Sequence, residues 1–356
     1  MPHLLEVKDL TTVFQGDGGT MTSVDGISFW VDSGEIVCLV GESGCGKSVT
    51  SLSLMGLLGK GGRVAAGQAM FEGRDLLAMK EKEFDTLRGD RISMVFQDPL
   101  TSLNPVFTIG RQIAESIRVH MGASKQEAEA RAVSLLNKVG MPDAAAVMKK
   151  YPHMLSGGQR QRVMIAMALA CNPRLLIADE PTTALDVTIQ AQIMELIRQL
   201  QRELNMSVIL ITHDIGLVAQ MADRVLVMYA GQIIEQAPVL ELFDHPGHPY
   251  TRALLRSVPP VPRMRDGREG LGSGENLEIR AAECGDAENW KGGLRLESIE
   301  GVVPEHYDKI TGCRFADRCP YRKENCSAPQ EETLLRPGHL ARCWRAGTLD
   351  GQKEVG

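Results

Sequence analysis

Hydrophobic positions along the chain form short compact blocks that alternate with longer stretches at helical spacing. The blocks at 35–40, 91–96, 175–178 and 207–212 are bounded by polar or turn residues, which predicts strands. The helical spacing predicts helices at 48–58, 108–120, 125–139, 156–170 and 187–204. Buried strands that alternate with helices are typical of an α/β protein with a mostly parallel sheet.

The pattern changes near residue 245. Turn residues precede a predicted helix at 250–257, prolines and charges follow it, and the stretch at 270–296 is polar with little periodicity. We therefore predict two domains, at 1–245 and 246–356, with a small helical subdomain at about 100–165 inside the first.

Length and charge narrow the class of protein. A chain of 356 residues is long enough for two domains, and a net charge of -6 offers no electrostatic argument for binding nucleic acid. No apolar run approaches the roughly 18 residues of a membrane span. The N-terminus lacks the charged and apolar regions of a secretory signal, so we expect a soluble cytosolic protein. Eight cysteines are unusual for that compartment.

A glycine-rich segment between the first predicted strand and helix fits the P-loop pattern G-x-x-x-x-G-K-[ST]. Glycines let main-chain N–H groups converge on phosphates, and the start of a helix adds the positive end of its dipole. Lys47 is suited to reach the β- and γ-phosphates, and the Ser48 hydroxyl is suited to bind Mg²⁺. Val49 lacks the hydroxyl that many P-loops have there but keeps its main-chain amide. The predicted phosphate-binding residues are Gly41, Glu42, Ser43, Gly44, Cys45, Gly46, Lys47, Ser48 and Val49.

Two carboxylates end the strand predicted at 175–178, which is the Walker B pattern. Asp179 would lie beside the metal, and Glu180 would face an attacking water. Two acids at a strand end also occur as a helix cap or a solvated turn, but an upstream P-loop favours the catalytic interpretation.

A second glycine-rich helix start, Leu155-Ser-Gly-Gly-Gln159, precedes Walker B by about 20 residues. Ser156 is suited to cap the helix and to bind phosphate, and Gly157 and Gly158 permit close approach of the main chain. One nucleotide does not need two phosphate cradles in one chain. The second cradle therefore predicts contact with a nucleotide held by another chain.

Together with the Q-loop Phe96-Gln97-Asp98-Pro99, the D-loop Ala184-Leu-Asp186 and His213 in Ile-Thr-His-Asp, these motifs resemble the ATP-binding-cassette family. The resemblance implies a cassette with a mostly parallel sheet core, an antiparallel β subdomain and a helical subdomain. It also implies roles for single residues. Phe14 would stack on adenine, Gln97 and Asp179 would join Ser48 at Mg²⁺, Glu180 would be the general base and His213 would contact the γ-phosphate. Ser156, Gly157, Gly158 and Gln159 would bind ATP in trans, and Asp186 would signal across the dimer.

Further segments are similar to the dipeptide, oligopeptide and nickel importer group, most of all to the first ATPase subunit of dipeptide permeases. They are 97–105, 151–155, 179–188, 248–255 and 301–304. The resemblance implies import of dipeptides or oligopeptides, with nickel chelates and haem-like cargo left open, by a peripheral subunit at the cytoplasmic face of the inner membrane. It implies as partners a second, paralogous ATPase, two membrane permeases and an extracytoplasmic solute-binding protein. A soluble cassette regulator that changes shape without transport is the alternative.

Four of the eight cysteines, Cys313, Cys319, Cys326 and Cys343, lie close together near the C-terminus. A cytosolic setting disfavours disulfides, and spacings of C-x₅-C and C-x₆-C are wide for zinc. Four thiolates suit an iron–sulfur cluster, and the region is similar to one that binds a [4Fe–4S] cluster in some dipeptide-type ATPases. Zinc and reduced structural thiols stay open, as do a structural role and a redox-sensing role for the region.

Overall fold

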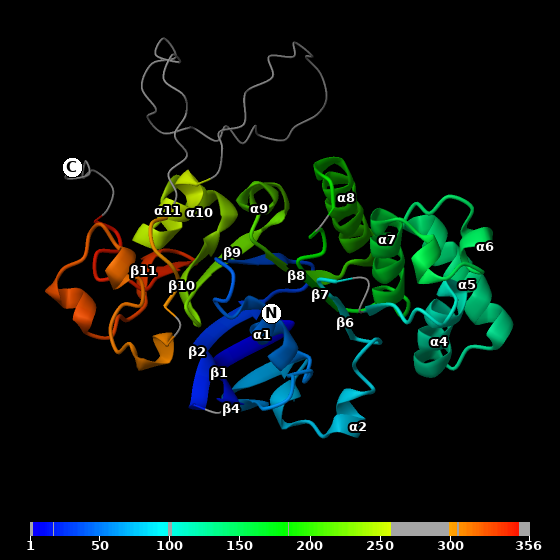
Figure 1. Ribbon diagram of the computed structural model, residues 1–356, viewed down its shortest axis with the longest axis horizontal. Coiled ribbons are helices and arrows are strands. Elements are labelled where there is room, and N and C mark those ends of the chain that lie inside the picture. The colour runs from blue at the N-terminus through cyan, green and yellow to red at the C-terminus, as the bar shows by residue number, and fades with distance from the viewer. Residues whose placement is uncertain are drawn as a thin grey trace, which may run out of the picture.

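The computed structural model describes residues 3–16, 18–98, 102–183, 185–257, 299–304 and 306–348. Within this part, two sheets occupy the middle of the molecule; a lobe of helices lies at one end, and the C-terminal segment, which adds two strands to the larger sheet, lies at the other (Figure 1). The strands of the larger sheet are β3 (Ile36–Val40), β6 (Ile92–Val95), β7 (Leu175–Asp179), β8 (Ser207–Thr212), β9 (Arg224–Tyr229), β10 (Gln232–Pro238), β11 (Thr333–Arg336) and β12 (His339–Ala341). The strands of the smaller sheet are β1 (Leu5–Gly16), β2 (Gly19–Val31), β4 (Gly62–Phe71) and β5 (Arg74–Asp75).

The larger sheet has the order β11-β12-β10-β9-β3-β8-β7-β6, and its five strands from β9 to β6 are parallel. The four predicted strands are confirmed within two residues at each end. Strand β3 shows why these strands are continuous apolar blocks in the sequence. Ile36, Cys38 and Val40 face one core cluster and Val37 and Leu39 face the other, so both faces are covered.

The smaller sheet is antiparallel, with the order β2-β1-β4-β5. Its apolar face meets one face of the larger sheet, and helix α1 (Lys47–Leu54) contributes Leu54 to the core between them. The sequence predicts α1 through residue 58, but the helix ends four residues earlier. Gly56, at a φ of 61°, turns the chain out of the helix.

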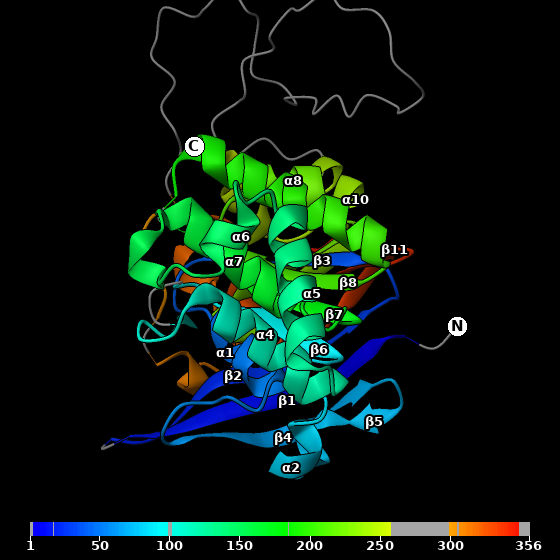
Figure 2. The ribbon, with the colours of Figure 1, turned by 90° about the vertical axis from the view of Figure 1, so that its right-hand side faces the viewer.

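Helices cover the other face of the larger sheet and form a lobe at one end of the molecule (Figures 1 and 2). In the lobe, α4 (Ile109–Met121), α5 (Lys125–Lys138) and α7 (Gly157–Ala168) pack on one another, and α7 also packs on α8 (Val187–Leu204) and β6. The remaining helices are α2 (Glu81–Phe84), α6 (Ala144–Val147), α9 (Ile215–Met221), α10 (Val239–Asp244) and α11 (Pro249–Arg256). The short 3₁₀ turns are η1 (Leu76–Ala78), η2 (Pro152–Met154), η3 (Tyr307–Lys309), η4 (Ala316–Arg318) and η5 (Glu324–Ser327).

The C-terminal segment lies at the end of the molecule opposite the helical lobe, coloured orange to red in Figure 1. Strand β12 pairs with β10 through Glu235↔Ala341 and Gln236↔Leu340, so the segment extends the larger sheet. Its Phe315 and Tyr307 are buried in the same core cluster as strand β9. The predicted boundary at 245 falls between α10 and α11. The polar stretch predicted at 270–296 lies outside the described residues.

Among the described residues, no helix combines the length and the apolar character needed to cross a membrane.

Candidate nucleotide site

The P-loop runs from the end of β3 to the start of α1, where the sequence predicts it. Gly46 stands directly before α1 with a φ of 108°, and a Cβ there would lie 2.7 Å from both Met228 Cε and the Ser23 carbonyl oxygen. A Cβ on Gly41 would lie 2.1 Å from the Met228 carbonyl oxygen. Only glycine fits either position, because neighbouring strands press on the loop. The loop is therefore shaped by its surroundings as well as by its own sequence.

Lys47 lies in the first turn of α1, with only 6% of the residue exposed. Its Nζ donates hydrogen bonds to the carbonyl oxygens of Gly41 at 2.7 Å and Glu42 at 2.9 Å. The ammonium group is thus held inside the curve of the loop. A phosphate in that curve would meet its charge directly.

Ser48 and Asp179 join α1 to the end of β7. The Ser48 hydroxyl donates to Asp179 Oδ1 at 3.1 Å. Asp179 is 4% exposed, and burial raises the pKa of its carboxyl group while the Ser48 hydrogen bond lowers it. A hydroxyl beside a buried carboxylate is a pair of hard oxygen ligands of the kind that Mg²⁺ binds.

Glu180 is the meeting point of three other side chains. Gln97 Nε2 donates to Glu180 Oε2 at 3.0 Å, the Thr183 hydroxyl donates to the same oxygen at 2.8 Å, and His213 Nδ1 lies 3.4 Å from Oε1. Glu180 itself has a φ of 44°, a left-handed conformation that a non-glycine residue rarely adopts. Strain of this kind is concentrated at functional sites. Thr183 was not predicted from the sequence, since a threonine two residues after a proline carries no distinctive signal.

Phe14 precedes the P-loop in the sequence and lies on β1, where it pairs with Met21 of β2 and Gly62 of β4. A Cβ on Gly62 would lie 2.7 Å from the Phe14 ring, so the glycine leaves room for the aromatic side chain. The structure thus gives the ring a place in the smaller sheet, half-buried at its surface.

The second predicted cradle begins α7 in the helical lobe, whereas α1 packs on β1, β2, β4 and β7. The Ser156 hydroxyl accepts a hydrogen bond from the Gln159 N–H at 3.4 Å, and Gln159 Oε1 accepts one from the Ser156 N–H at 3.1 Å. Gly158 lies against Ile189, and Asp186 caps α8 by accepting from the Ile189 N–H at 2.9 Å. The segment 155–159, which we call the signature, therefore lies next to the D-loop.

Comparison with known proteins gives the context of this geometry. A family model described as "ABC transporter" matches residues 24–183, and one described as "Oligopeptide/dipeptide transporter, C-terminal region" matches 234–285 and 286–326. The dipeptide transport ATP-binding protein DppD of Escherichia coli is 47% identical over 341 residues, covering 96% of both chains. The oligopeptide transport ATP-binding protein AppD of Bacillus subtilis is 47% identical over 346 residues, covering 97% of both.

The chain belongs to the ABC transporter family. Its group within the family is that of the dipeptide and oligopeptide transport ATP-binding proteins, and it is an ATPase.

Solved cassettes share its fold. The dimeric cassette MJ0796, solved with ADP and Pi, has a TM-score of 0.60 at 27% identity and covers 66% of this chain and 98% of its own. Structure cbiO1 from Clostridium perfringens, part of the transporter complex cbiONQ, has a TM-score of 0.58 at 30% identity, with coverages of 68% and 92%. The predicted cassette fold is confirmed.

The C-terminal region of this ABC transporter subunit brings its four clustered cysteines around one small cavity. Cys326 and Cys343 are buried, and Cys313 and Cys319 are half-buried. Burial raises the pKa of the Cys313 thiol to about 11 and that of Cys319 to about 12, with the neighbouring thiols adding to both shifts. In the described part of the chain, no three His, Cys, Asp or Glu side chains stand in a metal-holding arrangement.

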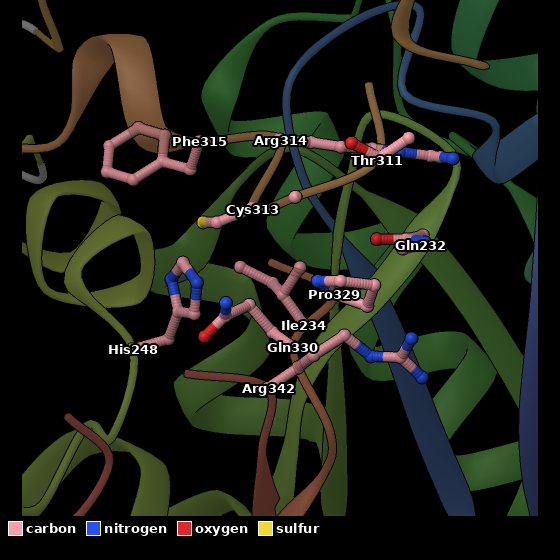
Figure 3. Close-up of a pocket in the computed structure, with 11 residues that line it drawn as sticks. Gln232, Ile234, His248, Thr311, Cys313, Arg314, Phe315, Pro329, Gln330 and Arg342 are labelled. Carbon is pink, nitrogen blue, oxygen red and sulfur yellow. The ribbon is translucent and has the colours of Figure 1, made fainter. Parts of the chain in front are cut away.

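A neighbouring cavity of about 70 Å³ shares Cys313 and the buried His248 with this one (Figure 3). His248 Nδ1 accepts a hydrogen bond from the Tyr250 N–H at 3.0 Å, and burial lowers the pKa of the ring to about 3. The imidazole is therefore neutral, with its proton on Nε2. The four thiols and the neutral imidazole thus line two neighbouring cavities without forming a metal-holding arrangement among the described residues.

Proposed function

We propose that this chain is the ATPase subunit that powers import of dipeptides or oligopeptides. Two relatives are named for dipeptide and oligopeptide transport, and the family model that matches the C-terminal region has the same description. Both support peptides as the transported substrate. The observation that carries its chemistry is the connected set of side chains around Glu180 and Asp179.

In the proposed mechanism, the P-loop amides from Gly41 to Gly46 and the Lys47 ammonium bind the phosphates, with Phe14 stacked on adenine. Mg²⁺, when bound, neutralises charge on the β- and γ-phosphates, and Ser48, Asp179 and Gln97 are the residues that would hold it. Glu180 accepts a proton from the attacking water as the new P–O bond forms and the bond to the ADP oxygen breaks.

His213 would contact the γ-phosphate while its ring stays close to the Glu180 carboxylate. The 3.4 Å separation and the two hydrogen bonds from Gln97 and Thr183 support a carboxylate held in one orientation. A base fixed in this way needs little reorganisation when the water attacks.

We further propose that ATP binds between two cassettes. Ser156, Gly157, Gly158 and Gln159 would contact a nucleotide held by a second, paralogous ATPase, with Asp186 at the interface. The dimeric form of the MJ0796 cassette supports this arrangement. Two membrane permeases and an extracytoplasmic solute-binding protein would complete an importer, with this chain peripheral at the cytoplasmic face of the inner membrane. The domains would be the cassette at 1–245 and a cysteine-rich domain at 246–356.

Glu180→Gln in the assembled transporter tests the chemistry. The amide cannot accept a proton as the carboxylate does, so we expect at least a hundredfold loss of turnover with the Kd for MgATP within about twofold of wild type. Glu195→Gln, on the exposed side of α8, is the matched control and should keep full turnover. Near-normal turnover in Glu180→Gln would contradict the assignment.

Uptake of a labelled dipeptide by cells carrying the same variant tests the transport role. Uptake should stop with Glu180→Gln and persist with Glu195→Gln. A cassette regulator without transport would copurify with no permease and would leave uptake unchanged in both variants.

We also propose that Cys313, Cys319, Cys326 and Cys343 hold a [4Fe–4S] cluster. The four thiols that line one cavity support this. A cluster there would be structural or regulatory, since these cysteines are not among the side chains gathered at Glu180.

Anaerobic purification tests the cluster. We expect a coloured protein with about four iron atoms and four sulfides per chain, lost in Cys319→Ser and kept in Cys171→Ser, whose cysteine lies in the turn after α7. A colourless protein containing zinc, or one free of metal, would refute the cluster. Neither result would affect the test at Glu180.

A further inference from the structure

Arg318, one residue before Cys319, reaches from the C-terminal segment into the P-loop. Its Nη1 lies 2.6 Å from Glu42 Oε2 and its Nη2 lies 3.0 Å from Glu42 Oε1, which is a bidentate pair. Glu42 is the second residue of the P-loop. The two residues are 276 positions apart in the chain.

The guanidinium group of Arg318 is hydrogen-bonded through all three of its nitrogens. Its Nε donates to the Glu300 carbonyl oxygen at 2.8 Å, Nη2 donates to those of Ile299 and Gly301, and Nη1 also donates to the Tyr229 hydroxyl at 3.2 Å. The side chain is 6% exposed, against 26% for Glu42. A planar fork fixed on several sides can hold a carboxylate in one position.

Glu42 is therefore held at three of its groups. Its carboxylate pairs with Arg318, its N–H donates to the Tyr250 hydroxyl at 3.0 Å, and its carbonyl oxygen accepts from Lys47. The next two residues, Ser43 and Gly44, are exposed. Glu42 is thus the last fixed point before the exposed part of the phosphate-binding turn.

The same segment supports the far side of the P-loop less directly. Tyr307 donates its hydroxyl to the Ser23 carbonyl oxygen at 3.1 Å, and Arg314 donates to the Ala230 carbonyl oxygen at 2.5 Å. The adjacent Gly231 N–H donates to the Cys45 carbonyl oxygen at 2.9 Å. The C-terminal segment therefore contacts the P-loop directly at Glu42 and is linked to Cys45 through Ala230 and Gly231.

We propose that Arg318 is a positioning residue for nucleotide binding: by holding Glu42, it fixes the P-loop in the shape whose N–H groups meet the phosphates. When a loop becomes ordered only on binding, the free energy of ordering it weakens the affinity for the ligand. A loop that is already held in its binding shape avoids this loss of affinity. The role does not depend on what the four cysteines bind, and Glu180 can act on bound ATP without it. The expected signature is a change in affinity with little change in the chemical step.

The Kd for MgATP, measured by titration calorimetry on the full chain, tests the role. Arg318→Ala should raise the Kd about tenfold, or about 1.4 kcal/mol. In the assembled transporter, KM for ATP should rise by a similar factor while kcat changes less than about twofold. Arg318→Lys keeps the charge without the fork and should lose about threefold.

A double-mutant cycle isolates the pair. Glu42→Gln weakens the same contact, so Arg318→Ala with Glu42→Gln should bind MgATP about as well as the weaker single variant. Arg336→Ala is the matched control, because it breaks a 2.8 Å pair between the same segment and Glu241 of α10, away from the P-loop. Its Kd should stay within about twofold of wild type.

Several outcomes would overturn the proposal. They are an unchanged Kd in Arg318→Ala, losses in the double variant that multiply, or a fall in kcat without a rise in KM. Should Arg318→Ala fail to fold, Arg318→Lys and Glu42→Gln decide alone: wild-type affinity in both refutes the role.

Discussion

Two helices of this protein begin at glycine-rich turns that the sequence predicts to bind phosphate, yet the two turns are built differently. Helix α1 begins after Gly46, which is left-handed and offers no side-chain cap. Helix α7 begins after Ser156, whose hydroxyl and whose partner Gln159 form a capping box. The first helix start relies on its neighbours, and the second satisfies its own N–H groups.

The two turns also differ in how deeply their residues are buried. At the P-loop, Gly41, Cys45, Gly46 and Lys47 are buried, and contacts come from Ser23, Met228, Gly231, Tyr250 and Arg318. At α7, Ser156 is exposed and Gly157, Gly158 and Gln159 are half-buried. A turn that forms its own capping box can present an open face to another chain. A turn pressed by neighbours can hold a nucleotide within its own chain.

Of the changes that test this difference between the two turns, removal of the Lys47 ammonium group should reduce MgATP affinity the most. Lys47→Ala deletes the charge inside the loop, so the isolated chain should bind MgATP at least about 100-fold more weakly. Lys125→Ala, at an exposed lysine of α5, controls for charge in general and should bind normally. Equal affinity in the two variants, measured by calorimetry, would mean that α1 is not the nucleotide-binding helix start.

The signature turn should give the opposite result in the isolated chain. Ser156→Ala should leave the Kd for MgATP within about twofold of wild type and lower the ATPase rate of the assembled transporter about tenfold, since the hydroxyl would act on the partner's nucleotide. Loss of the cap should also cost about 1 kcal/mol of unfolding free energy, measured in denaturant.

Two variants separate capping from contact in trans. Ser156→Asn keeps a capping oxygen and should recover stability but not ATPase rate. Ser124→Ala removes the same kind of capping box from α5 and should lose stability alone. Full ATPase activity in Ser156→Asn would show that Ser156 acts only as a cap.

Local signals explain how much of the site could be read from the sequence. The P-loop, Walker B and signature each occupy consecutive residues, and their strand-to-helix context is visible in the hydrophobic pattern. The left-handed φ of Glu180 and its bond to Thr183 carry no such signal, because they depend on how the chain leaves β7. Strands β9 and β10 were not predicted, although both are almost fully buried.

The residues that hold Glu42 of the P-loop could not be predicted from the sequence for a different reason. Arg318 and Tyr250 lie more than 200 residues from Glu42, and nothing near either residue indicates its partner. The pairing accompanies long-range contacts of the same segment: β12 pairs with β10, and Phe315 packs on the rings of Tyr229 and Tyr250. Tertiary contact thus completes a site whose chemistry is local.

The smallest expected effect comes from the hydroxyl of Tyr250. The ring is fully buried, with its centroid 4.7 Å from that of Tyr229, and burial raises the pKa of the hydroxyl, so it stays neutral. Tyr250→Phe keeps this packing and removes only the acceptor of the Glu42 N–H, so the Kd for MgATP should rise about two- to threefold. Tyr151→Phe, 38% exposed just before the signature, should leave the Kd unchanged. Equal Kd values in the two variants would show that the carboxylate contact with Arg318 holds Glu42 without help from its main-chain N–H.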